Sequence, residues 1–299
     1  MVAVRRELGR HVTVLFGHEQ GKYPDGNTVV VRGTHDSVVI DPALSARTLD
    51  PPLEVGHVLL THPHEDHVAG VSAVLAGSVA VHEADHAAVQ SVDGLMALYG
   101  VPEESRQGMT DLVVQRFHFE GWPDAVALRD GDTIDLGGVT VQLVHAPGHT
   151  AGHSVYVIDD GEMIVVVTGD VDLSTFGPYY GDAASSLTEF RSTLAMLRDL
   201  RADHYVTFHH KGVIDGHDAF ADAIDAYIAV FGRRTESLLA LLDRPRTFDE
   251  LVDDGIVYRA GTRPPVFGDS VERFSIRRHL DELLADGTIG TDGLQYWRA

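Results

Sequence analysis

Cysteine is absent from the 299 residues of this chain. Disulfide scaffolds, thiolate zinc sites and cysteine nucleophiles are therefore excluded. No uninterrupted apolar run approaches the ~20 residues that span a bilayer, and residues 1–15 lack the apolar core of a secretory signal. We therefore expect a cytoplasmic protein with no membrane partner.

Lysine is also scarce in this chain. The chain has 2 lysines beside 21 arginines and 31 aspartates beside 14 glutamates, and its net charge is −22. An aspartate-rich, lysine-poor surface is typical of halophilic proteins, in which multimolar salt screens the repulsion between carboxylates. Codon usage in a GC-rich organism would also replace lysine by arginine, but we favour the halophilic interpretation. Either way, the whole chain is a poor electrostatic partner for nucleic acid at low salt.

The charge is unevenly distributed along the chain. Residues 1–232 carry a net charge of −20, whereas residues 233–299 carry 10 arginines and 12 acidic residues, a net charge of −2. With 44% hydrophobic residues, the chain can build sizeable packed cores. The shift in composition therefore predicts a large domain at residues 1–232 and a small one at residues 233–299.

The larger part alternates short apolar runs with helical patterns, which predicts a mixed α/β layered fold. The expected strands are residues 12–16, 28–31, 38–41, 57–61, 139–144, 164–168 and 205–208. One helix is expected around Leu187–Leu200 and the next around Phe220–Phe231, because apolar residues there share one face. Weak helical patterns at residues 84–98 and 103–110 predict an insertion near the mouth of any site.

The smaller part has a different pattern. Helices are expected near residues 236–242, after the capping-box pair Thr247 and Glu250, and around residues 271–284. Two strands, residues 288–291 and 294–297, would be joined by the turn residues Asp292 and Gly293. Three helices followed by a β-hairpin predict a winged-helix domain.

One short string carries the strongest chemical signal. His62, His64, Asp66 and His67 follow an apolar strand and precede a helix-like run at residues 68–75. In an extended segment His62 and His64 point the same way, while Asp66 and His67, at the turn into the helix, can face a second position. Imidazole and carboxylate ligands together suit Zn²⁺, Fe or Mn, and the absence of thiolates disfavours a purely structural zinc site.

Three further polar motifs each follow a predicted strand. The turn Pro147-Gly148 presents His149, Asp170 follows Gly169 at the end of a buried run, and His209-His210 follows the short strand at 205–208. An α/β scaffold places its active site on such loops. We therefore expect these residues to share one site with the His62–His67 string.

This ordered set resembles the metallo-β-lactamase superfamily, and the resemblance covers about residues 8–230. It implies an αββα sandwich that holds two divalent metal ions, with Zn²⁺ expected and Fe or Mn as alternatives. His62, His64 and His149 would bind one ion, Asp66, His67 and His210 the other, and Asp170 would bridge them. We prefer His210 to His209 because the family usually has a Gly-His-Gly-like turn, whose middle position His210 fills.

The resemblance also implies a mechanism in which a hydroxide held by both metal ions attacks the substrate. Asp66 is the candidate catalytic residue for proton transfer, since the string places it beside that hydroxide. His64 stands where flavodiiron-type members have Glu, which argues against that branch. His153 would have one of two functional roles, orienting a ligand or donating a proton to the leaving group, or else it would only pack and cap a turn.

A hydrolase core followed by a winged helix resembles the subgroup that includes a mitochondrial single-strand endoribonuclease. We expect a small ester, thioester or related substrate, because the chain shows no convincing nucleic-acid surface. A phosphodiesterase or ribonuclease is the alternative, since Arg273, Arg277 and Arg278 of the small domain could meet phosphates. A nucleic-acid-binding regulatory protein with a relict metal site is a second alternative, which the intact ligand set disfavours. The small domain could also shape the active-site cleft or form a homodimer contact.

Overall fold

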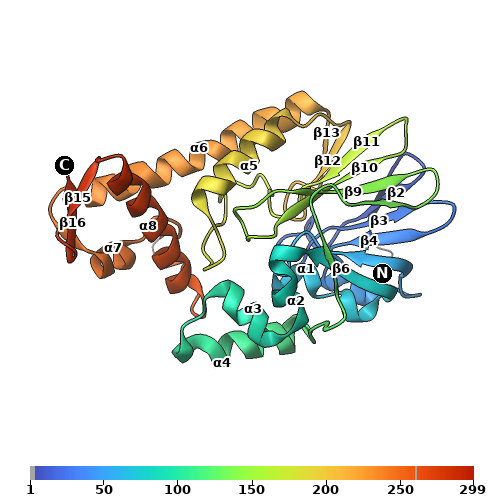
Figure 1. Ribbon diagram of the computed structural model, residues 1–299, viewed down its shortest axis with the longest axis horizontal. Coiled ribbons are helices and arrows are strands. Elements are labelled where there is room, and N and C mark those ends of the chain that lie inside the picture. Colours follow the sequence, from blue (N-terminus) through green and yellow to red (C-terminus); the bar gives the residue numbers. More distant parts are fainter. Residues whose placement is uncertain (1–3, 260) are drawn as a thin grey trace.

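The computed structural model describes residues 4–259 and 261–299. Two β-sheets lie face to face and helices cover their outer faces, as Figure 1 shows. The two packed sheets between layers of helices form the mixed α/β, αββα sandwich that the sequence predicted.

The first sheet contains seven strands in chain order, β1 to β7. Its first four strands pair antiparallel and the remaining pairs are parallel. The strands are β1 (Arg5–Leu8), β2 (Val12–Leu15), β3 (Thr28–Arg32), β4 (Ser37–Ile40), β5 (Glu54–Leu59), β6 (Leu75–His82) and β7 (Val126–Leu128).

The second sheet contains six strands in the order β13-β12-β11-β10-β9-β8. Its pairs are antiparallel except β11 with β12. The strands are β8 (Thr133–Asp135), β9 (Thr140–His145), β10 (Ser154–Asp159), β11 (Ile164–Val167), β12 (His204–Val206) and β13 (Val213–Asp215).

Alternation along the strands builds three apolar layers. Val29 and Val31 of β3 face the second sheet, whereas Val30 between them faces the outer helices. The first sheet is covered by α1 (Glu65–Val68), η2 (Val71–Ala73), α2 (His86–Gln90), α3 (Val92–Tyr99), α4 (Glu103–Asp111) and the π-helical turn η4 (Leu112–Arg116). The second is covered by α5 (Leu187–Asp199) and α6 (His217–Leu241). Two further 3-10 turns are η1 (Leu44–Thr48) and η3 (Glu83–Asp85).

The helix expected at residues 68–75 differs from the structure. α1 ends at Val68, the chain bends at Gly70, and β6 already begins at Leu75. A Cβ on Gly70 would lie 2.5 Å from the carbonyl oxygen of Ala43 and 2.6 Å from that of Pro42. This close approach of two backbone segments requires glycine at position 70, where the chain turns from α1 into η2.

The C-terminal part forms a smaller lobe with its own apolar cluster. It contains β14 (Arg246–Thr247), α7 (Phe248–Asp254), α8 (Gly268–Ala285), β15 (Ile289–Thr291) and β16 (Gln295–Arg298). The Thr247–Glu250 capping box is present, and β15 and β16 form the expected hairpin. α6 runs without interruption through the boundary expected between residues 232 and 233, so one helix belongs to both parts (Figure 1).

α8 packs against the larger part through polar contacts. His279 is fully buried between the Tyr180 hydroxyl, at 2.8 Å, and the Thr235 hydroxyl, at 3.0 Å. The Arg278 guanidinium donates to the carbonyl oxygen of Ser185. The smaller lobe is thereby fixed beside the loops at the end of the sandwich. Within the described residues, no helix is long and apolar enough to cross a membrane.

Candidate metal centre

Four loops that leave strands at one edge of the sandwich build the site. The loop after β5 carries His62 and His64, and α1 then carries Asp66 and His67. His149 lies in the tight β9–β10 turn, Asp170 follows β11, and His209 follows β12. A Cβ on Gly148, whose φ is +127°, would lie 2.3 Å from Phe190 backbone atoms, so glycine is required for this turn to sit against α5.

The first group of converging side chains is His62, His64, His149 and Asp170. The His149 Nε2 atom lies 3.0 Å from both His62 Nε2 and His64 Nδ1. The same nitrogen lies 3.3 Å from Asp170 Oδ2. Three ring nitrogens and one carboxylate oxygen therefore point at a common position.

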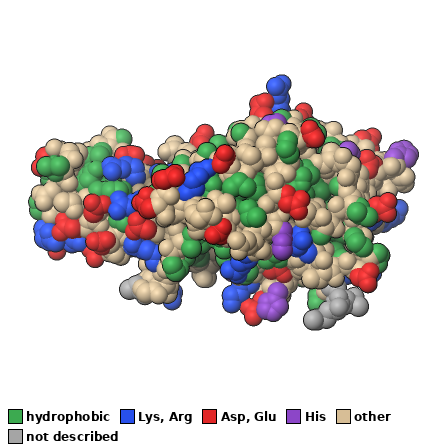
Figure 2. All heavy atoms as spheres, turned by 90° about the horizontal axis from the view of Figure 1, so that it is seen from below, with side chains coloured by type: hydrophobic (Ala, Val, Ile, Leu, Met, Phe, Trp, Pro, Cys, Tyr) green, Lys and Arg blue, Asp and Glu red, His purple; other side chains and the backbone are tan. Residues whose placement is uncertain are grey.

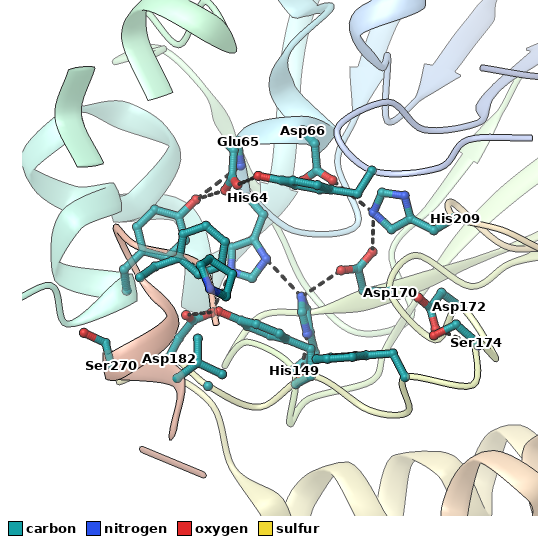
Figure 3. A pocket seen from close by; sticks show the side chains of 18 of the residues that line it. His64, Glu65, Asp66, His149, Asp170, Asp172, Ser174, Asp182, His209 and Ser270 are labelled. Carbon is teal, nitrogen blue, oxygen red and sulfur yellow. Dashed lines mark hydrogen bonds and ion pairs between the residues drawn. The ribbon is translucent and has the colours of Figure 1, made fainter. Parts of the chain in front are cut away.

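The second group is Asp66, His67 and His209. Asp66 Oδ2 lies 3.0 Å from His209 Nε2, and His67 Nε2 lies 2.9 Å from Asp170 Oδ1. Asp170 therefore presents one oxygen to each group. Figure 3 shows its carboxylate between His149 and His209.

Hydrogen bonds to the other ring nitrogen orient three of these histidines. His149 Nδ1 lies 2.9 Å from the Tyr179 carbonyl oxygen, and His209 Nδ1 lies 2.7 Å from that of Gly21. His67 Nδ1 faces Asp41 Oδ2 at 2.9 Å. A ring that donates from Nδ1 has its lone pair on Nε2, which is the atom that faces the site in all three.

Burial controls the charge of the first group. It lowers the pKa of His62 and of His149 well below the ordinary range, because a desolvated ring surrounded by other histidines resists protonation. Burial alone would also lower the pKa of His64, but the Asp182 carboxylate 2.8 Å from its Nε2 raises it to about 9. The low-pKa rings of His62 and His149, together with the other imidazole nitrogens and the carboxylates that converge at two adjacent positions, are a donor set suited to divalent cations. The residues present therefore fit two metal ions.

The structure places His209, and not His210, in the second group of converging side chains. The turn after β12 is held by the Thr207 amide on the Gly212 carbonyl and by the Lys211 amide on the His209 carbonyl. His210 occupies the tip of this turn with φ +60° and is exposed, whereas His209 is buried against Asp66. His209 is therefore the better-placed candidate for the seventh ligand.

His153 lies beside the site and contacts Asp170 through the backbone. Its Nε2 accepts from the Asp170 amide at 3.2 Å, and its Nδ1 donates to the Ala146 carbonyl. Burial lowers its pKa to about 4, so the ring is neutral near pH 7. Of the two roles considered for His153, the geometry supports orienting a ligand and not proton donation.

Several buried polar residues of the site escaped the sequence analysis. Asp41 accepts from the Thr61 amide and hydroxyl as well as facing His67. Asp85 accepts from the Thr150 hydroxyl and the Gly152 amide, which fixes the loop on either side of His149. Their sequence signal is weak, because each is a single aspartate following an apolar or polar run, and nothing local shows what it contacts.

A cavity of about 390 Å³ opens over the metal-ligand candidates. Its floor includes His64, Asp66, His149, Asp170 and His209. Its outer walls come from the α3–α4 region, the loop that precedes α5, and the segment between α7 and α8 (Figure 3). The smaller lobe thus contributes directly to the space in which a substrate would bind.

Comparison with known proteins gives one family. The sequence model of the metallo-beta-lactamase superfamily matches residues 23–210. An uncharacterized protein of Mycobacterium tuberculosis is 35% identical over 147 residues, which are 45% of this chain and 62% of that protein. A hydroxyacylglutathione hydrolase of Shewanella sp. is 27% identical over 198 residues, 64% of this chain and 65% of the relative. The match thus covers less than two thirds of the length of each of these two relatives.

A third relative is similar over nearly the whole chain. The atrochrysone carboxyl ACP thioesterase of Pseudocercospora fijiensis is 23% identical over 317 residues, 97% of this chain and 80% of the relative. Among solved structures, a beta-lactamase domain protein from Burkholderia ambifaria has a TM-score of 0.71 at 18% identity, covering 99% of this chain and 94% of that one. A Thermus thermophilus metallo-beta-lactamase family protein has a TM-score of 0.65 at 23% identity, covering 92% and 94%. At sequence identities this low, the structural similarity shows that the fold is shared and nothing further.

Proposed function

Because this chain belongs to the metallo-beta-lactamase superfamily, we propose that it is a two-metal hydrolase that cleaves a small ester, thioester or related acyl substrate. The observation that carries the proposal is the pair of adjacent ligand groups joined by Asp170 beneath an open cavity. The relatives named hydroxyacylglutathione hydrolase and carboxyl ACP thioesterase support an acyl substrate.

We assign His62, His64 and His149 to one ion, Asp66, His67 and His209 to the other, and Asp170 to both. Zn²⁺ is the proposed metal, and Fe or Mn would suit the same ligands. A pair of such ions supplies a nucleophile at neutral pH and a Lewis acid for the substrate oxygen.

The chain itself supplies orientation and proton transfer. Asp170 is held from its backbone amide by His153, and His67 is held by Asp41, so the ligand atoms are preorganised. Asp66 Oδ2 faces His209 at 3.0 Å, and the residue also lines the cavity. We assign Asp66 Oδ1, its other carboxylate oxygen, as the acceptor for the proton that the attacking water loses.

We also propose that the smaller lobe is a winged helix that acts as part of the enzyme. The order helix, strand, helix, helix, strand, strand supports this proposal. The arginines of α8 are engaged within the protein: Arg273 pairs with Asp249 and Asp269, Arg277 bonds to the Tyr296 hydroxyl, and Arg278 bonds to the Ser185 carbonyl. These contacts favour an acyl substrate over a phosphodiester substrate bound through α8.

High salt is the proposed working condition. The net charge of −22 comes mainly from aspartate, and Figure 2 shows carboxylates distributed over the face it presents. Multimolar salt screens the repulsion among them. We therefore specify multimolar KCl for the assays below.

Metal content tests the ligand assignment. Purified protein should bind two ions, and His64→Ala and Asp170→Ala should each bind less metal, as measured by mass spectrometry of the metals after dialysis. His209→Ala should lose one ion, whereas the matched variant His210→Ala should keep both. The ligand assignment would be overturned if His64→Ala and Asp170→Ala both kept the wild-type metal content. It would also be overturned if His210→Ala lost metal and His209→Ala did not.

Activity tests the proposed reaction. The metal-loaded protein should hydrolyse a thioester or lactone, and Asp170→Ala should abolish the turnover. Hydrolysis of bis(p-nitrophenyl) phosphate, with no turnover of acyl substrates, would instead select the phosphodiesterase alternative.

A further inference from the structure

The outer wall of the cavity is apolar and aromatic. Val101 and Met109 come from the α3–α4 region, Phe176 from the loop before α5, and Val266 and Phe267 from the segment before α8. Phe267 packs in the same apolar cluster as Met109, so this wall is continuous between the two lobes. A substrate group that extends outward from the metal centre therefore meets hydrocarbon.

The segment from the smaller lobe is fixed in place. The Glu272 carboxylate, fully buried on α8, accepts from the amides of Ile256 and Tyr258 at 2.9 and 2.8 Å. Tyr258 itself lines the cavity. A buried carboxylate that holds several backbone amides gives residues 256–258, including the cavity residue Tyr258, a defined position.

No lysine or arginine lines this cavity in the part of the chain that the structure describes. The neighbouring cations are engaged elsewhere: Arg234 donates to the Phe176 and Pro178 carbonyls, and Arg263 donates to the Val252 carbonyl and pairs with Asp269. Carboxylates, in contrast, are present at Glu65, Asp172 and Asp182, in addition to the metal-ligand candidates. An anionic group that extends to the outer wall would therefore lose its water and find no lysine or arginine there to pair with.

We infer that the substrate carries an uncharged, apolar acyl group, which binds between the α3–α4 region and the segment before α8. This inference rests on the proposed hydrolase function and adds the chemical class of the acyl group. The volume of about 390 Å³ suits a small ligand of this kind. Acyl groups that end in a carboxylate or phosphate are disfavoured by the same wall.

A matched pair of thioesters tests the inference. The N-acetylcysteamine thioesters of hexanoic acid and of adipic acid have equal chain lengths and differ in the terminal carboxylate. Thiol release can be followed with a thiol reagent, because the chain contains no cysteine. With the metal-loaded full chain, kcat/KM should be about 100-fold higher for the hexanoyl compound, since an unpaired buried charge is strongly rejected.

The outcomes separate the two proposals. Turnover of neither thioester, nor of an apolar lactone, by protein with both metal ions bound would overturn the proposed function. Comparable turnover of both thioesters, or a preference for the adipoyl compound, would overturn the inference and leave the hydrolase function standing.

A single substitution locates the selectivity. Val266 lines the cavity and is 37% exposed, so the fold should tolerate Val266→Lys. The added cation should reduce the preference for the hexanoyl compound about fivefold, mainly by improving turnover of the adipoyl compound. Thr262→Lys is the control, since Thr262 lies in the same segment, is exposed and does not line the cavity. An equal change in both variants, or no change in Val266→Lys with metal content intact, would contradict the placement of the acyl group.

Discussion

Asp41 offers the sharpest test of how the second ligand group is organised. Its side chain is 1% exposed, and its Oδ2 lies 2.9 Å from His67 Nδ1 and 2.7 Å from the Thr61 hydroxyl. Its Oδ1 accepts from the Thr61 amide at 2.8 Å. In Asp41→Asn, one of these acceptors becomes an NH₂ group that faces donors. The backbone should be unchanged, because φ at Asp41 is +47° and asparagine tolerates that conformation.

The expected magnitude follows from the role of such contacts. Loss of a carboxylate that orients a ligating histidine costs about 10–100-fold in metal affinity. At about 1.4 kcal/mol per tenfold change, that is about 1.4–2.8 kcal/mol of binding free energy. The loss should concern the ion held by Asp66, His67 and His209, and the ion at the other group should bind with nearly wild-type affinity.

Chelator competition with metal analysis measures both affinities. Asp36→Asn is the matched control, because the Asp36 carboxylate also pairs with a histidine, His57 at 3.2 Å, but lies outside the site. Wild-type affinity for both ions in Asp41→Asn would refute the argument that Asp41 organises His67. An equal loss of affinity for both ions would refute the argument that Asp41 affects the binding of only one of them.

Two further predictions concern the smaller lobe. Burial lowers the pKa of His279 to about 3, so the unfolded state, with a pKa near 6.5, binds more protons between these values. The free energy of unfolding should therefore fall as the pH drops below 6.5, and this group should contribute a loss of about 2 kcal/mol at pH 5. In denaturant unfolding, the stability of His279→Gln should depend less on pH than that of the wild type. An unchanged dependence of stability on pH would exclude His279 as the cause. Thr247→Ala removes the capping box of α7 and should cost about 1 kcal/mol in the same assay, whereas no loss would show that the cap is dispensable.

Part of the sandwich could be predicted from apolar runs along the sequence. Strands β3, β4, β9 and β11 have continuous or alternating apolar residues, and the sequence located each of them. Seven strands were not among those expected: β1, β6, β7, β8, β10, β13 and β14. Of these, β7 and β14 are three and two residues long, and their side chains are exposed or half-buried. Their pairing depends on neighbours distant in sequence, which a local pattern does not contain.

The ligand candidates were predictable because they follow strand ends in a fixed order. The structure brings His62, His64, Asp66, His67, His149 and Asp170 together, and it adds His209 where His210 was expected. His210 was preferred because it fills the middle position of the family's Gly-His-Gly-like turn, but in the structure it lies at the exposed tip with φ +60°. The fixed ring of His209, with Nδ1 on the Gly21 carbonyl, depends on a segment 188 residues away.

The role of the smaller lobe could be argued from the sequence only as a choice among a nucleic-acid surface, a cleft wall and a homodimer contact. Its arginines suggested the nucleic-acid surface, because the sequence shows charge but not the partners of each charge. In the structure those arginines contact carboxylates, a tyrosine and backbone carbonyls, and the fully buried Glu272 holds the segment that carries Tyr258. The polar residues of α8 therefore position an apolar wall over the metal centre, so a substitution that loosens α8 should change substrate selectivity before it changes metal binding.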